Sequence, residues 1–255
     1  MPSYPFALQL YSVRDHLAGN SREGLRRVRE AGYRHVELAG YYDLPVTRVK
    51  ELLDDLGLVP VSMHVPYDLV TGKTSDVIRD AQFLGAFHVV VPWVGGEMCP
   101  NRDAWLEAAE NMDDAGALLK EAGLSLSYHN HAHEFEYFEE ETIFDIIFGN
   151  SDPENLQIQL DLCWAVVGKA DVLEILRRYE GRIPLVHVKD YTPGDEEGQV
   201  TITELGRGVM DFKVLLPAAL NAGASWFIVE QDSSEKDTLE SARDNAVFMR
   251  EFGRG

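Results

Sequence analysis

The sequence predicts a (β/α)8 TIM barrel that forms one domain over residues 1–255, and three observations support this prediction. Helical patterns repeatedly end in a glycine that leads into a short β-branched or aromatic run. The predicted strands and helices alternate in eight units, and eight strand–helix units in about 250 residues are typical of this barrel. No Gly-x-Gly-x-x-Gly motif follows the first strand, although the main competing fold, a doubly wound open sheet, often carries one there.

Glycines mark where several helices end and the next strands begin. Gly32 in REAGYRHVEL, Gly85 in FLGAFHVVVPW and Gly123 in KEAGLSLSYHNH each follow a helical pattern. Glycine ends a helix by adopting the left-handed conformation, and the β-rich run after it is typical of a strand. In chain order, the predicted strands span residues 6–12, 33–38, 59–65, 87–92, 124–130, 155–161, 183–189 and 226–231.

The predicted helices lie between these strands, and polar residues support several of their starts. Ser21 begins the first helix with Glu23 in its first turn, Asn101 precedes RDAWLEAAE, and Ser233 or Ser234 precedes EKDTLESARD. In chain order, the predicted helices span residues 21–31, 45–56, 74–85, 101–122, 139–149, 170–180, 209–222 and 237–251.

Composition and charge argue against several classes of protein. The chain is 45% hydrophobic and 26% charged, which is typical of a globular protein and not of a disordered one. Lys and Arg total 23 against 43 Asp and Glu, for a net charge of −20. Such a charge repels phosphate backbones and anionic lipid surfaces, so we expect neither nucleic acid nor a membrane as a partner.

The cysteines and the N-terminal segment indicate a cytoplasmic protein. Cys99 and Cys163 are far apart and form no Cys-x-x-Cys pair, which argues against a disulfide framework and a structural zinc knuckle. The start MPSYPFALQLYS lacks the basic and apolar regions of a signal peptide. No apolar run approaches the roughly 20 residues that a membrane-spanning helix needs.

The chain has eight histidines, and five of them are predicted at or just beyond the carboxyl ends of strands. Active sites of TIM barrels lie at that end of the strands. The other three, His16, His35 and His88, are expected to be surface or packing residues. The five histidines at strand ends are His64, His129, His131, His133 and His187.

Alternation along the strands predicts which side chains point into the barrel, because residues two apart share a face. In LQIQLDL the apolar residues should face the helices, which directs Gln157, Gln159 and Asp161 inward. The same reasoning, applied to LSLSYHN, PLVHVKD and WFIVEQD, places further polar residues inside or at the strand ends: Ser125, Ser127, His129, His187, Lys189 and Glu230.

One rim of the barrel should therefore collect several imidazole and carboxylate groups. This mixture suits about one divalent ion per chain, of manganese, cobalt, zinc or iron, with magnesium as a further candidate. The alternative is a cleft lined by polar residues that only hydrogen-bond to one another. We favour the metal site because an Asp, a His and a Glu end three successive predicted strands.

The chain resembles the sugar phosphate isomerase/epimerase family, the xylose isomerase-like TIM barrels that include inosose dehydratase, ketose epimerases and endonuclease IV. The resemblance covers nearly the whole chain and rests on LQLYSVRD, SMHVP, YHNHAHEFE, QLDLCWAVVGKAD, LVHVKDY, ELGRGVMDF and FIVEQD, in that order. It implies an isomerase or epimerase that acts on a keto-sugar or related polyol through a metal-stabilised enediolate.

The resemblance leaves other functions open. A dehydratase or lyase acting on a keto-sugar or inosose would use the same enolate, with expulsion of a leaving group in place of reprotonation. An endonuclease IV-like repair enzyme conflicts with the net charge, and a non-catalytic sugar-binding barrel would lack the metal. A homo-oligomer is neither predicted nor excluded.

The resemblance also implies a metal ligand set of Glu, Asp, His and Glu from strands five to eight. The last three correspond to Asp161, His187 and Glu230. At strand five the inward position holds His129, and the nearest carboxylate is Glu134 in the following loop. We therefore expect Glu134 as the fourth ligand, with His129 or His131 as the alternative.

The remaining roles follow from the same comparison. His129, His131, Lys189 and Glu230 are the predicted catalytic residues, with the histidines as acid or base and Lys189 as electrostatic support. The Gly206-Arg207-Gly208 loop could bind a phosphate before a helix, or could be only a tight turn. The predicted substrate-binding residues are His64, Tyr11, Trp93, Trp164 and Arg207.

Overall fold

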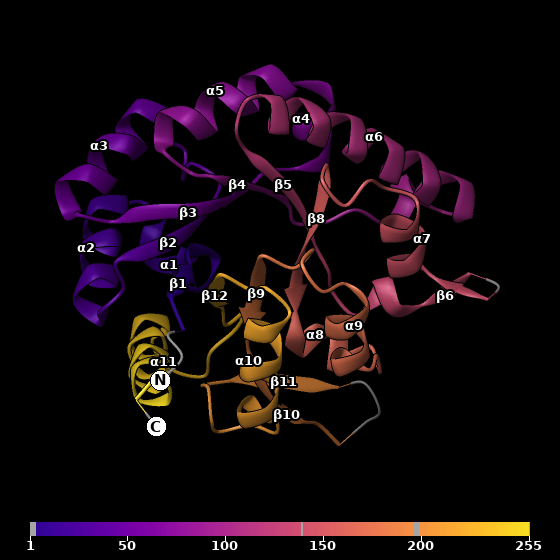
Figure 1. Cartoon of the computed structure of the whole chain (residues 1–255). Coiled ribbons are helices and arrows are strands. Elements are labelled where there is room, and N and C mark those ends of the chain that lie inside the picture. Colours follow the sequence, from indigo (N-terminus) through magenta and orange to yellow (C-terminus); the bar gives the residue numbers. More distant parts are fainter. Residues whose placement is uncertain (1–3, 139, 196–198, 255) are drawn as a thin grey trace.

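Eight parallel strands close into a barrel, and helices surround it (Figure 1). The structure is a computed structural model that describes residues 4–138, 140–195 and 199–254. In order around the barrel the strands are β1 (Phe6–Gln9), β12 (Trp226–Val229), β9 (Leu185–Val188), β8 (Leu156–Asp161), β5 (Ser125–His129), β4 (His88–Val91), β3 (Val59–His64) and β2 (His35–Ala39). The parallel pairing of β1 with both β12 and β2 closes the barrel, which confirms the predicted fold class.

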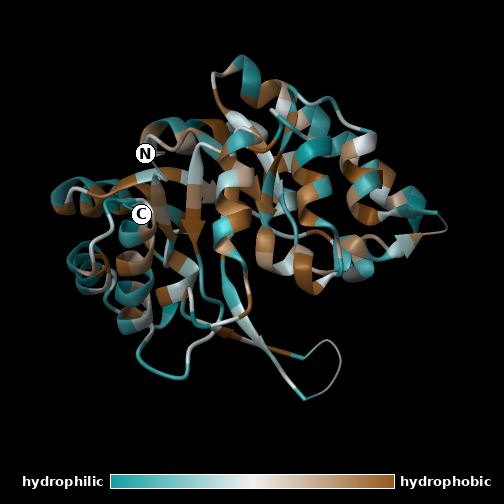
Figure 2. Cartoon of the chain, turned by 60° about the horizontal axis from the view of Figure 1, so that its bottom comes forward, coloured by the Kyte–Doolittle hydropathy of each residue, from teal (hydrophilic) through white to brown (hydrophobic). Residues whose placement is uncertain are grey.

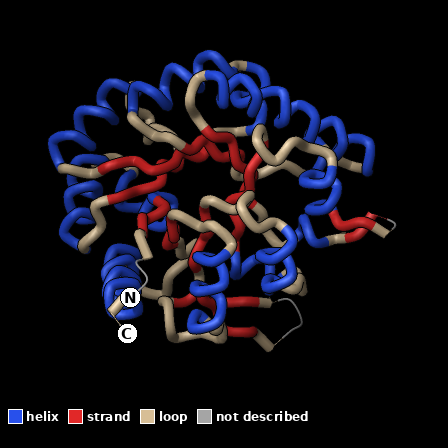
Figure 3. The backbone as a smooth tube through the Cα atoms, in the orientation of Figure 1, coloured by secondary structure: helices blue, strands red, loops and turns tan. Residues whose placement is uncertain are grey.

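The helices lie outside this barrel, as the tube view shows (Figure 3). Gly32, Gly57 and Gly85 end three of them in the left-handed conformation, as predicted. The eight helices that follow the strands are α2 (Ser21–Ala31), α3 (Val46–Leu56), α5 (Thr74–Leu84), α6 (Arg102–Glu121), α7 (Ile143–Gly149), α9 (Val172–Arg178), α10 (Phe212–Asn221) and α11 (Thr238–Phe252). Three shorter helices are α1 (Arg14–Leu17), α4 (Tyr67–Gly72) and α8 (Leu162–Val167).

The residues at the helix starts agree with the prediction at two helices and differ at a third. Asn101 caps α6 as expected, since its side chain accepts a hydrogen bond from the amide of Ala104. Ser21 is the first residue of α2 as expected, and Asn20 before it supplies the cap. At α11 the cap is Asp237 and not Ser233 or Ser234, because the Asp237 carboxylate accepts from two amides of the first turn.

Three further departures come from local structure between strands and helices. The first strand ends at Gln9 and not at residue 12, because Leu10–Val13 forms a 3-10 turn. The helix predicted from residue 139 begins at Ile143, since β6 (Tyr137–Phe138) and β7 (Glu141–Thr142) pair as a hairpin, and residue 139 lies outside the described residues. A second hairpin, β10 (Asp190–Pro193) with β11 (Val200–Thr203), lies between β9 and α10.

Apolar side chains of the helices pack against the outer face of the barrel and form the main core. Helix α2 shows the pattern, with Leu25, Val28 and Ala31 buried among exposed charged residues. Hydrophilic and hydrophobic residues alternate along the outer helices in Figure 2. None of the helices in the described parts of the chain combines the length and the hydropathy that a membrane span requires.

Inside the barrel, Ala7, Val61 and Ile228 form a small apolar cluster of buried residues. His88 at the start of β4 is also buried, and its Nδ1 atom has no hydrogen-bond partner within the described ranges. Burial lowers the pKa of His88 to about 4, so the folded protein holds this imidazole neutral at neutral pH. As predicted from its position, His88 is a packing residue.

His88 should make the protein less stable in acid. Its folded-state pKa is about 4, whereas an unfolded histidine titrates near 6.5, so the unfolded chain binds the extra proton between these values. The free energy of unfolding should therefore fall by up to about 3 kcal/mol as the pH drops through this window. Urea unfolding of the parent and of His88→Gln at pH 7 and pH 4.5 should show the smaller pH dependence in the variant. An equal dependence in both proteins would contradict the assignment.

Candidate active site

A cavity of about 540 Å³ opens at the carboxyl ends of the barrel strands. This is the end at which the sequence predicts the site. Trp93 and Tyr11 are roughly half exposed beside it, so the cavity has an aromatic rim that water can reach. Seven of the predicted site residues line it: Tyr11, His64, Trp93, His129, His131, Trp164 and Glu230.

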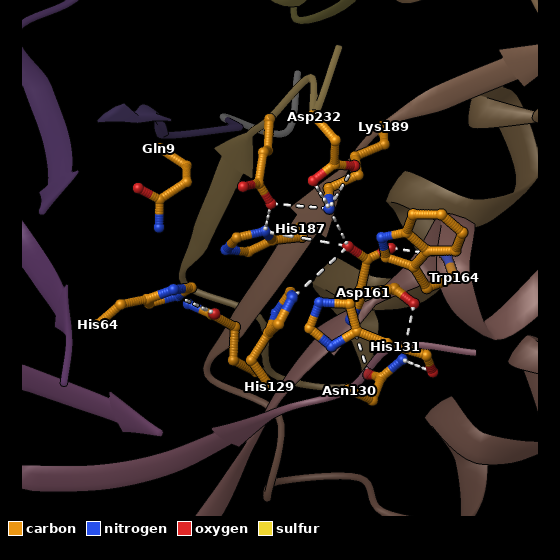
Figure 4. Close-up of polar contacts among 12 residues, drawn as sticks. Gln9, His64, His129, Asn130, His131, Asp161, Trp164, His187, Lys189 and Asp232 are labelled. Atoms are coloured by element: carbon orange, nitrogen blue, oxygen red, sulfur yellow. Dashed lines mark hydrogen bonds and ion pairs between the residues drawn. The ribbon is translucent and has the colours of Figure 1, made fainter. Parts of the chain in front are cut away.

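Four buried side chains at the strand ends form a cluster that could hold a metal ion. His129, Asp161, His187 and Glu230 each offer one ligand atom, and these atoms lie within 4.8 Å of one another. The Nδ1 atom of His187 lies 2.8 Å from Glu230 Oε2 and 4.0 Å from Asp161 Oδ2. His129 Nε2 is also 4.0 Å from Asp161 Oδ2 (Figure 4). Two imidazoles and two carboxylates at this spacing suit a divalent ion such as zinc, manganese, cobalt or iron.

Lys189 lies beside this cluster with its side chain fully buried. Its ammonium group is 3.0 Å from Asp161 Oδ2, 2.8 Å from Glu230 Oε2 and 3.0 Å from Asp232 Oδ2. Burial alone would lower the pKa of Lys189, but the three carboxylates raise it well above its ordinary value. Lys189 is therefore a fixed positive charge beside the cluster.

A further buried carboxylate, that of Glu37, lies against one of the cluster histidines. Glu37 on β2 has no exposed surface, and its Oε1 atom lies 2.7 Å from His187 Nε2. Burial would lower the pKa of His187, but Glu37 and Glu230 on its two sides raise it to about 10. Four carboxylates, including Asp161 and Asp232, thus outnumber the two cationic groups His187 and Lys189. This excess of negative charge also fits a divalent cation.

Within the segment YHNHAHEFE, Glu134 lies apart from the cluster, although it was expected as the fourth ligand. The Oε1 atom of Glu134 accepts a hydrogen bond of 2.6 Å from the Tyr128 hydroxyl, and Oε2 accepts one of 2.7 Å from the amide of His131. His133 adds a contact of 3.2 Å to the same carboxylate. Glu134 therefore groups with His131 and His133, apart from the cluster of Asp161, and His129 occupies the strand-five position. Both oxygens of Glu134 are therefore used, one by a side chain of β5 and one by an amide of its own loop.

Three buried nitrogen atoms around the cavity have no hydrogen-bond partner among the residues that the structure describes. They are the Nδ1 atoms of His129 and His131 and the indole Nε1 of Trp164. The His131 ring lies between two aromatic residues, 5.0 Å from Trp93 and 6.3 Å from Trp164. Burial lowers the pKa of His131 to about 3, which keeps the ring neutral. Buried polar groups normally have hydrogen-bond partners, and a ligand bound in the cavity would supply them here.

The predicted phosphate site at Gly206-Arg207-Gly208 is not supported. The amides of Gly206 and Gly208 both donate to Asp190 Oδ2, each over 2.9 Å, so a carboxylate of the chain already uses them. Arg207 is largely exposed and lies 3.4 Å from Asp244. It is not one of the residues that line the cavity. The loop is a tight turn, which was the favoured interpretation of this segment.

Sequence reasoning missed two residues that shape the site. Asn130 accepts a hydrogen bond of 2.9 Å from the amide of Asp161 and donates to its carbonyl, which joins the ends of β5 and β8. The only signal for Asn130 was its place within YHNH. Glu37 was missed as well, although an acidic residue in the middle of the predicted strand HVELA is a signal that could have found it.

Comparisons with known proteins agree with this architecture. The family described as xylose isomerase-like TIM barrel matches residues 25–252. Inosose dehydratase of Clostridium perfringens is 26% identical over 178 residues, which cover 63% of this chain and only 59% of that protein. Inosose dehydratase of Bacillus licheniformis is 24% identical over 262 residues, which cover 88% of this chain and 86% of the relative.

A solved structure of similar size shows the same fold. It is a sugar phosphate isomerase/epimerase from Parabacteroides distasonis, which is 26% identical and superposes with a TM-score of 0.78 over 97% of this chain and 94% of its own. The relatives are thus named as a dehydratase and as an isomerase/epimerase, so the comparisons point to an enzyme. Because the family match extends over most of the chain, this protein belongs to the xylose isomerase-like TIM barrel family.

Proposed function

We propose that this protein is a divalent-metal-dependent carbon–oxygen lyase that acts on a keto-cyclitol or keto-sugar through an enolate. The observation that carries the proposal is the ligand cluster of His129, Asp161, His187 and Glu230 at the end of a cavity that also contains His131. The inosose dehydratases among the relatives support this class of substrate and reaction.

The cluster would hold one ion, of manganese, cobalt, zinc or iron, or of magnesium. When bound, such an ion acts as a Lewis acid that polarises a substrate ketone and makes the neighbouring C–H bond more acidic. Lys189 lies within 3.0 Å of two of the ligand carboxylates and would hold them in place. Asn130 would fix the position of Asp161 through its backbone.

Residues of the chain itself can bind the substrate and move its proton. Trp93, Tyr11 and Trp164 offer apolar surface to the sugar ring, and the free indole N–H of Trp164 can donate to a hydroxyl. His131 lines the cavity and its Nδ1 atom has no partner in the described residues, so it can accept the proton from the carbon beside the carbonyl while the electron pair of that C–H bond enters the enolate. The same pair then expels the β-oxygen, and His131 returns the proton to the departing hydroxyl or alkoxyl group.

Isomerisation or epimerisation is the second candidate. It starts from the same enolate, but a proton returns to carbon and no bond to oxygen breaks. The Parabacteroides distasonis protein, described as a sugar phosphate isomerase/epimerase, favours this outcome. We rank it second because the cavity holds the imidazoles of His129 and His131, and an imidazole is a suitable acid for a departing oxygen.

A single assay should separate the two candidates. The protein is incubated in deuterated water with manganese and a panel of inososes and keto-sugars, and the products are followed by mass spectrometry and NMR. We expect deuterium beside the carbonyl of recovered substrate and a product that has lost water. Deuterium uptake with an epimer or isomer as the product would favour the second candidate. If no substrate exchanges with manganese, or with cobalt, zinc, iron or magnesium in its place, the enolate mechanism is wrong.

A further inference from the structure

Glu37 is a carboxylate buried inside the barrel, and it is not one of the residues that line the cavity. Its neighbours on the adjacent strands are Gln9 on β1 and Ser62 on β3, which lie directly opposite it in the sheet register. Gln9 Nε2 donates to Glu37 Oε1 over 2.8 Å, and Ser62 Oγ donates to Oε2 over 2.5 Å. The register of β2 and β3 also shifts between Val36 and Glu37, and such irregularities re-aim a side chain. The orientation of the carboxylate is therefore set by the barrel.

We propose that Glu37 is a positioning residue that fixes the tautomers of two histidines of the site, His187 directly and His64 through Gln159. Each step follows from the hydrogen-bonding capacity of the groups. An ionised carboxylate only accepts hydrogen bonds, whereas a neutral imidazole has one donor and one acceptor nitrogen. A fixed carboxylate therefore dictates which nitrogen of a neighbouring histidine carries the hydrogen.

His187 is the direct case. Its Nε2 atom lies 2.7 Å from Glu37 Oε1, so this nitrogen must carry a hydrogen. The opposite nitrogen, Nδ1, faces the carboxylates of Glu230 and Asp161 in the ligand cluster. Without an ion a carboxylate lies beside each nitrogen, so His187 is cationic and carries a hydrogen on both. When an ion binds, Glu37 would keep the hydrogen on Nε2, and Nδ1 would give up its hydrogen and coordinate, in the arrangement of carboxylate, histidine and metal that orients many metal ligands.

His64 is reached through the amide of Gln159. Gln159 Nε2 lies 2.5 Å from Glu37 Oε2, which requires the amide to turn its NH₂ group toward Glu37. Its carbonyl oxygen then faces His64 Nε2 at 2.9 Å, and Glu37 Oε1 is 3.0 Å from the same nitrogen. Both neighbours are acceptors, so His64 Nε2 carries the hydrogen. The His64 ring lines the cavity and keeps the lone pair of Nδ1 for a substrate hydroxyl.

The first test observes the tautomers in the parent protein and needs no variant. Protein labelled with ¹⁵N-histidine is examined by NMR at pH 8, without metal and after addition of zinc. We expect the hydrogen on Nε2 of His64 in both states, and on Nε2 of His187 with zinc on Nδ1. A hydrogen on Nδ1 of His64, or zinc on Nε2 of His187, would overturn the proposal.

The second test replaces the carboxylate with a neutral group of the same shape. In Glu37→Gln the affinity for zinc, measured by competition with a chelator, should fall about 10–100-fold, which is the usual effect of losing such a partner. The His64 signal should also shift toward the other tautomer. Ser62→Ala is the matched control, because it removes one donor to Glu37 and leaves both histidine contacts in place. Its zinc affinity should stay within about threefold of the parent.

The His187 half of this inference rests on the proposed metal-dependent function, and the His64 half does not. If zinc binds as expected but no keto compound exchanges its proton, the proposed reaction fails and the role of Glu37 stands. If the parent binds no zinc, the tautomer of His64 in the metal-free protein still decides the role of Glu37. Parent-like zinc affinity and an unchanged His64 tautomer in folded Glu37→Gln would refute it.

Discussion

Asp161→Asn protein should fold as a barrel but should retain no divalent ion after dialysis and show no turnover above background. Asp161 lies in the middle of the ligand cluster, within 4.0 Å of both His129 and His187 and 3.0 Å from Lys189. Its other oxygen caps helix α8 by accepting from the amide of Trp164, and asparagine can keep that cap. The substitution therefore removes a charged ligand without removing the local hydrogen bond. The loss of metal affinity should exceed the roughly 10–100-fold loss expected for an outer partner.

Metal content by elemental analysis, together with circular dichroism to check folding, would measure this effect. Glu230→Gln should behave in the same way, because Glu230 belongs to the same cluster. Asp232→Asn is the matched control, since Asp232 pairs with Lys189 but is not one of the four cluster residues. It should retain the ion. Parent-like metal content in both Asp161→Asn and Glu230→Gln would rule out the proposed site.

His131→Ala should retain the ion, but its turnover rate should fall about 10²–10⁴-fold, which is the usual effect of losing a general acid or base. His131 lines the cavity, its Nδ1 atom has no partner in the described parts of the chain, and it is absent from the cluster of Asp161. His129→Ala should instead release the ion, because His129 belongs to that cluster. The two neighbouring histidines should thus give different combinations of metal content and rate.

The control for this pair is His133→Ala. His133 contacts Glu134 and the carbonyl of Val94 and does not line the cavity, so its loss should change turnover by less than about tenfold. Steady-state rates on a working substrate, with metal content measured on the same samples, would separate the three variants. Normal turnover in His131→Ala would show that His131 moves no proton. Loss of the ion from that variant would make His131 a ligand.

Much of the fold and part of the site could be predicted from the sequence. Glycines after helical patterns located the helix ends, because few other residues adopt the left-handed conformation, and Gly32, Gly57 and Gly85 have positive φ in the structure. Alternation along a strand fixes which face each side chain takes. It placed Asp161 and His187 correctly within the barrel, and the two are paired in the register of β8 and β9.

Residues beyond the strand ends could not be placed in this way, because a loop side chain lies wherever its hydrogen bonds are satisfied. Glu134 was expected at the metal cluster, but the Tyr128 hydroxyl and the amide of His131 hold it within its own loop. The amides of Gly206 and Gly208 were considered for a phosphate, but Asp190 accepts from both. Neither outcome can be read from residue type or spacing.

Local periodicity is enough to predict the eight strand–helix units and the inward direction of the main ligands. Two contacts of the site needed the folded chain: His129 lies in the cluster where Glu134 was expected, and Glu37 lies against His187. Glu37 and His187 are 150 residues apart, and they meet because the closure of the barrel brings side chains from opposite strands into one interior. Contacts across that interior depend on how all eight strands close together, and no local pattern encodes them.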